Sequence, residues 1–185
     1  YGFLNIILDC GIQTRRIAGG SGVIPHSIPW HAALVFKKSG YHCGGTILDE
    51  RHILTASHCI RPIPYSNNFD IIVGSHRISN STDGTVHEIC LAVQHPEYSE
   101  ENNLHNDFAI VHLKQPIQIG TRAFPACLPK SDLGGNFLTG KMMTVSGWGL
   151  TSFGGSQPGV LHSVNVPGIT HAQCEYKYYQ KSITN

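Results

Sequence analysis

The feature that most constrains the fold of this 185-residue chain is a succession of short apolar runs with turn-forming residues between them. The runs are rich in β-branched side chains, and clusters of Gly, Pro and Asn separate them. Such runs are typical of β-strands, and many short strands in series indicate a sandwich or a barrel. The expected strands cover residues 29–36, 45–48, 53–56, 69–73, 86–93, 108–113, 141–148 and 160–166.

Helical periodicity is scarce along the chain. Residues 171–181 are the segment for which we expect a short helix. Residues 117–136 contain several turn-forming clusters and few strand signals. We therefore expect them to connect two structural units.

The charge of the chain narrows the classes of partner. Charged residues make up 14% of the sequence, the formal net charge is +1, and no block of Lys or Arg stands out. Because nucleic-acid binding needs a clustered basic face, we expect no nucleic-acid partner. No apolar run is long enough to span a membrane, so we expect no membrane association.

The six cysteines are dispersed, and no two of them form a Cys-x-x-Cys pair. Dispersed cysteines favour disulfides and an oxidising compartment. The triplet Asn-Ser-Thr at residues 80–82 makes Asn80 a candidate glycosylation site. Together these features predict a secreted, extracellular protein. Cys90 lies within an expected strand, where we predict a buried thiol.

Four segments carry the functional signal. They read Arg-Ile-Ala-Gly-Gly at 16–20, Cys-Gly-Gly-Thr-Ile-Leu at 43–48 followed by Leu-Thr-Ala-Ser-His-Cys at 54–59, Asn-Asp-Phe-Ala-Ile-Val at 106–111, and Val-Ser-Gly-Trp-Gly at 145–149. In this order and at these separations they resemble the chymotrypsin/trypsin family of serine proteases, from about residue 10 to residue 185. The resemblance implies an all-β fold of two antiparallel barrels, with the first barrel complete and the second incomplete in this chain.

The residues that the resemblance assigns to catalysis are His58 and Asp107. A serine hydroxyl is a poor nucleophile at neutral pH and needs a base that titrates near that pH, which a histidine supplies. A buried carboxylate can hold that histidine in one tautomer by accepting its other N–H. By resemblance, His58 is the general base and acid, and Asp107 is the orienting carboxylate. The alternatives are a structural histidine beside a disulfide and a solvated acid at a strand edge.

The resemblance also implies activation by proteolysis. Cleavage between Arg16 and Ile17 would free an α-amino group, whose new positive charge can act as a switch. The basic pair at residues 15–16 implies an activating protease of trypsin-like specificity. The implied layout is an activation peptide at 1–16 and a peptidase domain at 17–185, the latter made of a first barrel at 17–120, a connection at 121–140 and a partial second barrel at 141–185.

Two disulfides follow from the resemblance, Cys43–Cys59 and Cys10–Cys127. A rival interpretation is a metal site built from His42, Cys43, His58 and Cys59. Because each His–Cys pair is adjacent in sequence, which is not the usual spacing of metal ligands, we expect no metal there and no cofactor.

The leading hypothesis is a serine endopeptidase zymogen that hydrolyses peptide bonds through an acyl-enzyme. Its expected partners are protein or peptide substrates, a trypsin-like activator and serpin-type inhibitors. Family members continue with a Gly-Asp-Ser-Gly-Gly-Pro segment, which this sequence lacks, and Ser156 does not have that setting. We therefore expect a C-terminally truncated domain that is inactive alone. The alternative is a non-catalytic protease homologue that acts as a binding or regulatory module.

Overall fold

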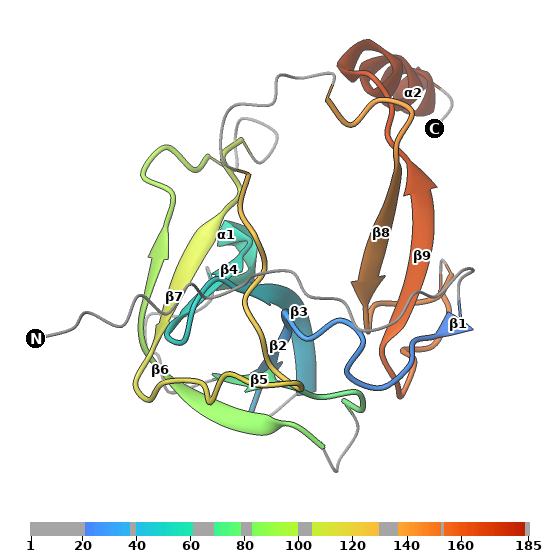
Figure 1. Ribbon diagram of the computed structural model, residues 1–185. Helices are drawn as coiled ribbons and strands as arrows, with labels where there is room; N and C mark the ends of the chain where they lie inside the picture. The colour runs from blue at the N-terminus through green and yellow to red at the C-terminus, as the bar shows by residue number, and fades with distance from the viewer. Residues whose placement is uncertain are drawn as a thin grey trace, which may run out of the picture.

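The computed structural model describes residues 21–37, 40–60, 69–78, 83–99, 105–129, 137–152 and 154–183 (Figure 1). Strands dominate these ranges, as the apolar runs predict. The elements are β1 (Ser21–Gly22), β2 (His31–Phe36), β3 (Gly40–Ile47), β4 (His52–Thr55), α1 (Ser57–Ile60), β5 (Phe69–Val73), β6 (Thr85–Gln94), β7 (Ala109–Leu113), β8 (Met142–Gly147), β9 (His162–Pro167) and α2 (His171–Ile183).

Six strands close into an antiparallel barrel in the order β2-β3-β4-β7-β6-β5. Burial alternates along its strands; in β7, for example, Ala109, Val111 and Leu113 are buried while the residues between them are partly exposed. Alternate side chains point to opposite faces of a strand, so one face of each strand fills the barrel. The resulting core contains Leu34, Ile47, Ile53, Phe69, Ile71, Val73, Ile89, Val111 and Leu113.

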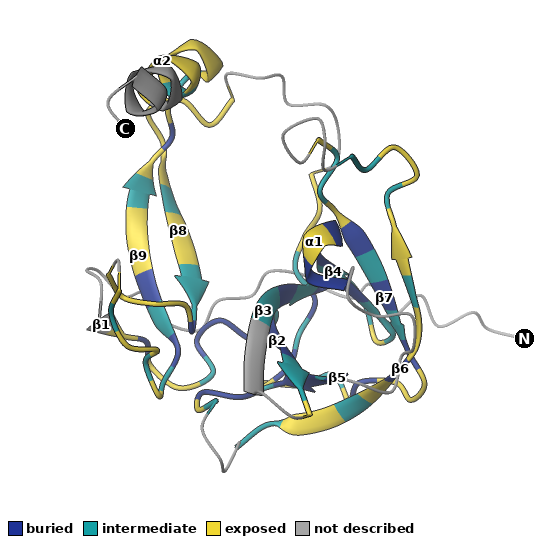
Figure 2. Cartoon of the chain, turned by 180° about the vertical axis from the view of Figure 1, so that it is seen from behind, coloured by how far each residue is buried: buried dark blue, intermediate teal, exposed yellow. Residues whose placement is uncertain are grey.

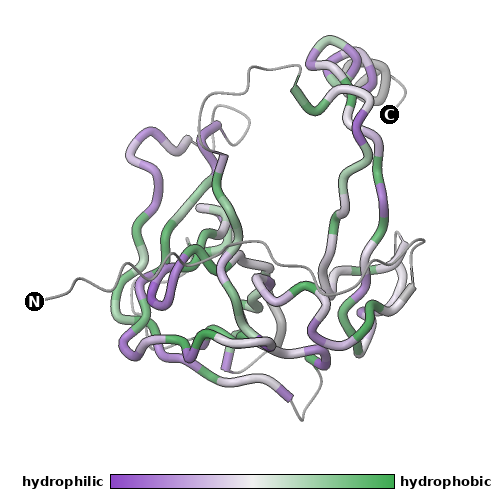
Figure 3. The backbone as a smooth tube through the Cα atoms, viewed as in Figure 1, coloured by the Kyte–Doolittle hydropathy of each residue, from purple (hydrophilic) through white to green (hydrophobic). Residues whose placement is uncertain are grey.

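The second structural unit is a three-stranded sheet in the order β1-β9-β8. Strands β8 and β9 pair along their whole length, from Met142–Pro167 to Gly147–His162. Several residues of both strands are exposed, which Figure 2 shows as stretches coloured for exposure. In the colouring by hydropathy, these strands mix hydrophobic and hydrophilic residues (Figure 3).

A second hydrophobic cluster joins this sheet to the outside of the barrel. Trp148 is fully buried there and packs with Ala33 of β2 and Ile72 of β5. The indole Nε1 of Trp148 donates to the backbone carbonyl oxygen of His76 at 3.2 Å, and the backbone N–H of Leu161 donates to the same oxygen at 2.8 Å. The two units are therefore held together by apolar packing around a hydrogen-bonded indole.

This architecture confirms the predicted fold class, an all-β protein with a closed first barrel and a partial second sheet. The limits proposed for the activation peptide and for the two barrels stay predictions, and residues 1–16 lie outside the described ranges. Within those ranges, no helix combines the length and the hydropathy that crossing a membrane requires.

The loop after β5 is closed by one carboxylate. Oδ1 of Asp83 accepts hydrogen bonds from the hydroxyl of Ser75 at 2.7 Å and from the backbone N–H groups of His76 and Arg77 at 2.8 and 2.9 Å. Burial alone would raise the pKa of Asp83, but these hydrogen bonds outweigh it and lower the pKa to about 2. Asp83 thus remains an anion that anchors the loop.

Candidate active site

Two paired strands bring the predicted catalytic residues together. His58 lies in α1, three residues after the end of β4, and Asp107 lies two residues before the start of β7. Strands β4 and β7 are antiparallel neighbours, with Thr55 paired to Ala109. The end of β4 and the start of β7 therefore lie side by side, and residues 49 positions apart in sequence become neighbours in space.

The carboxylate of Asp107 contacts His58 at two points. Nδ1 of His58 lies 2.7 Å from Oδ2 of Asp107, and the backbone N–H of His58 donates to Oδ1 of the same carboxylate at 2.9 Å. The side chain of Asp107 is 22% exposed and that of His58 is 51% exposed. The ring is thus held from its inner side, while half of the side chain remains open to solvent.

The carboxylate is stabilised as an anion. Burial alone would raise the pKa of Asp107, but hydrogen bonds from the ring and backbone of His58, together with the charge of that ring, outweigh burial and lower the pKa below its ordinary value. An ionised Asp107 can only accept hydrogen bonds, so when the His58 ring is neutral its proton lies on Nδ1. The other ring nitrogen, Nε2, then carries the lone pair that a general base needs.

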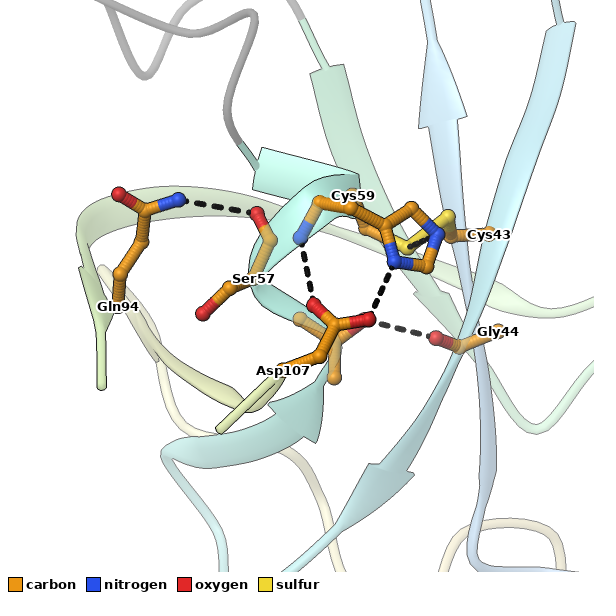
Figure 4. Close-up of a disulfide and its surroundings, with 8 residues drawn as sticks. Cys43, Gly44, Ser57, Cys59, Gln94 and Asp107 are labelled. Atoms are coloured by element: carbon orange, nitrogen blue, oxygen red, sulfur yellow. Dashed lines mark hydrogen bonds and ion pairs between the residues drawn. A yellow bond between two sulfur atoms is a disulfide. The ribbon is translucent and has the colours of Figure 1, made fainter. Parts of the chain in front are cut away.

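Two polar contacts of Ser57, the residue before His58, hold the segments of His58 and Asp107 in place. The fully buried Ser57 donates its hydroxyl hydrogen to the backbone carbonyl oxygen of Phe108 at 2.7 Å. Nε2 of Gln94 on β6 donates to the backbone carbonyl oxygen of Ser57 at 3.1 Å, and Figure 4 shows the Gln94 amide directed at it. Sequence reasoning identified neither contact, because neither has a local sequence signal.

A disulfide fixes the other side of the helix. Cys43 on β3 and Cys59 in α1 are bonded, and they are 16 residues apart in sequence (Figure 4). Sγ of Cys59 lies 3.4 Å from Nε2 of His58. The bond therefore ties the turn that carries His58 to the neighbouring barrel strand.

The disulfide removes the two thiolates on which the rival metal interpretation depends. Cys43, His58 and Cys59 offer ligand atoms within 4.8 Å of one another. Metal ligation by cysteine needs the free thiolate, which a disulfide does not provide. Nδ1 of His58 is moreover occupied by Asp107. The side chain of His42 lies outside the described residues.

The remaining predicted site residues lie largely outside the described ranges. This holds for Arg16, Ile17, Cys10 and Asn80. Cys127 is disulfide-bonded, but its predicted pairing with Cys10 stays a prediction.

The expectation that Cys90 is buried is wrong. Its thiol is free and exposed, because Ile89 points into the barrel and the next residue of the strand faces outward.

A cleft of about 530 Å³ opens between the barrel and the second sheet. It is lined by Gly44, which follows the bonded Cys43, and by residues of β8, β9 and the turn after β8. The cleft thus begins one residue from the disulfide that holds the His58 helix. Its other wall includes the exposed Val145 and Leu150.

The closed barrel, the adjoining sheet and the joined His and Asp side chains define a protein of the chymotrypsin-like serine protease class. The family model for trypsin matches residues 17–185, and the chain belongs to that family.

Curated relatives agree with this assignment. The chain is 35% identical over 164 residues to ovochymase-2 of Mus musculus, covering 86% of this chain and 26% of the relative. It is 33% identical over 175 residues to a venom serine protease of Polistes dominula, covering 91% and 62% of the two chains. It is 30% identical over 190 residues to the proclotting enzyme of Tachypleus tridentatus, covering 95% and 51%. The chain thus spans between 26% and 62% of the length of these relatives.

Proposed function

We propose that this chain supplies the acid–base half of a serine endopeptidase active site, with His58 as the general base and acid and Asp107 as the residue that orients it. The observation that carries the proposal is the two-point contact, in which one carboxylate accepts both the ring and the backbone N–H of His58. A solvated acid at a strand edge would need neither contact. The family membership supports a protease-type function.

In this proposal Nε2 of His58 takes the proton of a serine hydroxyl while the serine oxygen attacks the carbonyl carbon of a peptide bond. The proton then passes to the leaving amine nitrogen as the C–N bond breaks, which leaves an acyl-enzyme. A water molecule repeats the sequence and regenerates the serine hydroxyl. Asp107 stays ionised throughout and stabilises the imidazolium that forms twice in the cycle.

The serine of this mechanism belongs, by resemblance, to a Gly-Asp-Ser-Gly-Gly-Pro segment, which the 185 residues do not contain. A base without its nucleophile and oxyanion donors retains no efficient route to hydrolysis. The 185-residue chain on its own is therefore expected to be inactive. Rapid turnover of Arg- or Phe-based amide substrates by this purified chain would contradict that expectation.

We also propose that the protein is a zymogen. The basis is the Arg16-Ile17 sequence and the implied layout of an activation peptide at 1–16 and a peptidase domain at 17–185. Protein or peptide substrates, a trypsin-like activator and serpin-type inhibitors are the partners that fit. The Cys43–Cys59 disulfide supports a secreted protein, because such bonds persist in oxidising compartments.

The test is to read the source transcript beyond the codon for Asn185. An open frame that continues into Gly-Asp-Ser-Gly-Gly-Pro supports the catalytic role, and the protein expressed from that frame should hydrolyse peptide amides after cleavage at Arg16. A stop codon directly after Asn185 would overturn it. The chain would then be studied as a non-catalytic homologue, for which retention of both His58 and Asp107 has no evident use.

A further inference from the structure

A second joined pair of His and Asp side chains lies on the outer face of the barrel, away from His58. Nδ1 of His52 lies 2.9 and 2.8 Å from Oδ1 and Oδ2 of Asp49. Oδ1 of Asp49 also accepts the backbone N–H groups of Arg51 and His52 at 2.7 and 2.9 Å. The carboxylate is therefore held in place, and it restrains the His52 ring through Nδ1.

The proton on the His52 ring is fixed as well. Burial alone would raise the pKa of Asp49, but hydrogen bonds from Arg51 and His52 outweigh it and lower the pKa below its ordinary value. A carboxylate only accepts hydrogen bonds, so the proton in this contact lies on Nδ1 of His52. Nε2 of His52 consequently presents a lone pair on its far side.

Nε2 of His52 faces a second histidine, His112. Nδ1 of His112 on β7 lies 3.0 Å from Nε2 of His52 on β4, and the two residues are direct partners in the pairing of these strands. Both residues occupy outward positions of their strands, and the side chain of His52 is 40% exposed. On the other side of His112 its strand partner is Leu91, which is itself exposed. The pair is therefore open to water.

We propose that His52 and His112 form a binding site for a divalent transition-metal ion of the zinc or copper type. Two imidazole nitrogens bound to one tetrahedral zinc at about 2.0–2.1 Å lie about 3.3 Å apart, close to the 3.0 Å between Nε2 of His52 and Nδ1 of His112. Binding breaks the hydrogen bond between the two rings, and both rings turn so that their lone pairs point at one ion. Asp49 acts as the carboxylate that orients a metal-bound histidine, and water molecules fill the remaining coordination positions of the ion.

The ligand set decides the kind of ion. Imidazole nitrogens suit zinc, copper and nickel, whereas calcium and magnesium prefer oxygen ligands. Binding moves the His112 proton from Nδ1 to Nε2 and releases no proton when both rings are neutral. When a ring is protonated, the metal must displace that proton, so affinity falls as the pH falls.

The nearby cations do not compete for the site. The guanidinium of Arg51 donates to the backbone carbonyl oxygen of Lys114, and the ammonium of Lys114 is paired with Glu88 at 2.7 Å. The expectation of no metal rested on the Cys and His residues around His58. It did not consider His52 and His112, which 60 residues separate in sequence and which only strand pairing brings together.

The test is a titration of the metal-free 185-residue chain with Zn²⁺, and separately with Cu²⁺, against a competing chelating dye. We expect uptake of one equivalent with tighter binding of Cu²⁺, loss of that equivalent in His52→Gln and in His112→Gln, and affinity weaker by about 10- to 100-fold in Asp49→Asn. His105→Gln, which removes another exposed histidine, is the matched control and should bind normally.

A second measurement, the melting temperature, distinguishes loss of metal binding from misfolding of a variant. Zn²⁺ should raise the melting temperature of the unmodified chain and of His105→Gln, but not that of His112→Gln, because the ion links β4 to β7. Absence of stoichiometric uptake, or uptake that survives both His52→Gln and His112→Gln, would overturn the proposal. So would uptake that is lost only in His58→Gln. None of these outcomes bears on the protease function, since the site is separate from His58.

Discussion

The hydroxyl of Ser57 donates a hydrogen bond to the backbone carbonyl oxygen of Phe108 over 2.7 Å. It thereby joins the residue before His58 to the residue after Asp107. The serine is fully buried, so the contact links the segments that carry His58 and Asp107 from the inside of the protein.

Replacing Ser57 with Ala removes this donor, while the carbonyl oxygen of Phe108 still accepts the backbone N–H of His95 at 2.9 Å. We expect the free energy of unfolding to fall by about 0.5–1.5 kcal/mol, the net contribution of a typical hydrogen bond. Urea denaturation measures the change. Thr144→Ala is the control, since its hydroxyl bonds the exposed Asn165 at 2.9 Å and its loss should cost less than about 0.5 kcal/mol. Equal effects of the two substitutions would contradict the role given to Ser57.

The Cys43–Cys59 disulfide is predicted to stabilise the fold mainly by constraining the unfolded chain. A loop closed over 16 residues is worth about 3 kcal/mol in that description. The double substitution Cys43→Ala with Cys59→Ala should lower the free energy of unfolding by about that amount. Amide hydrogen exchange should also rise in α1, which the bond anchors. Unchanged exchange at Ser57–Ile60 would show that the bond does not hold the helix.

The loop carboxylate Asp83 gives a pH dependence of known sign. Its pKa is about 2 in the folded chain against an ordinary value of 3.8, so the unfolded chain takes up its proton first as the pH falls. The stability that Asp83 contributes is fully present above about pH 4 and is lost as the pH falls toward 2. The difference in urea midpoint between the unmodified chain and Asp83→Asn should therefore shrink over that window. Glu97→Gln, an exposed acid, should show no such window.

His31 gives a second pH dependence at higher pH. Burial lowers the pKa of His31 to about 4, and its Nε2 has no hydrogen-bond partner among the described residues. The unfolded chain binds the proton near the ordinary value of 6.5 and the folded chain does not, so stability falls as the pH drops from 6.5 to about 4. His31→Gln cannot titrate and should remove this part of the pH profile. An unchanged profile would mean that His31 is protonated in the fold without cost.

Much of the barrel follows from the sequence, because its strands are short and rich in β-branched residues. The run at 69–73 forms β5 with the predicted bounds, and the next residue is Gly74, whose φ of 68° suits a glycine. The four-residue helix α1 was not predicted, since one turn is too short to show a helical period. The two-residue strand β1 is likewise too short to leave a signal.

The residues of the site also fall into those that the sequence predicts and those that it does not. His58 and Asp107 are predicted from their motifs, but their contact depends on pairing between strands far apart in sequence. Ser57, Gln94 and the His52–His112 pair were missed for that reason: each acts through a long-range partner. An outward-facing histidine on each of two strands is visible in the sequence, whereas the neighbour relationship of those strands is not.

The most direct test of the account is the rate of peptide-amide hydrolysis by Asp107→Asn, made in the protein expressed from the complete open reading frame and cleaved after Arg16. The matched control is Asp70→Asn, which removes a carboxylate with the same 22% exposure from the barrel. We predict that kcat falls about 10⁴-fold in Asp107→Asn, as in the family's own triad, and stays unchanged in the control. A folded Asp107→Asn protein with kcat within about tenfold of the unmodified enzyme, or an unmodified protein with no activity, would contradict the assignment of His58 and Asp107.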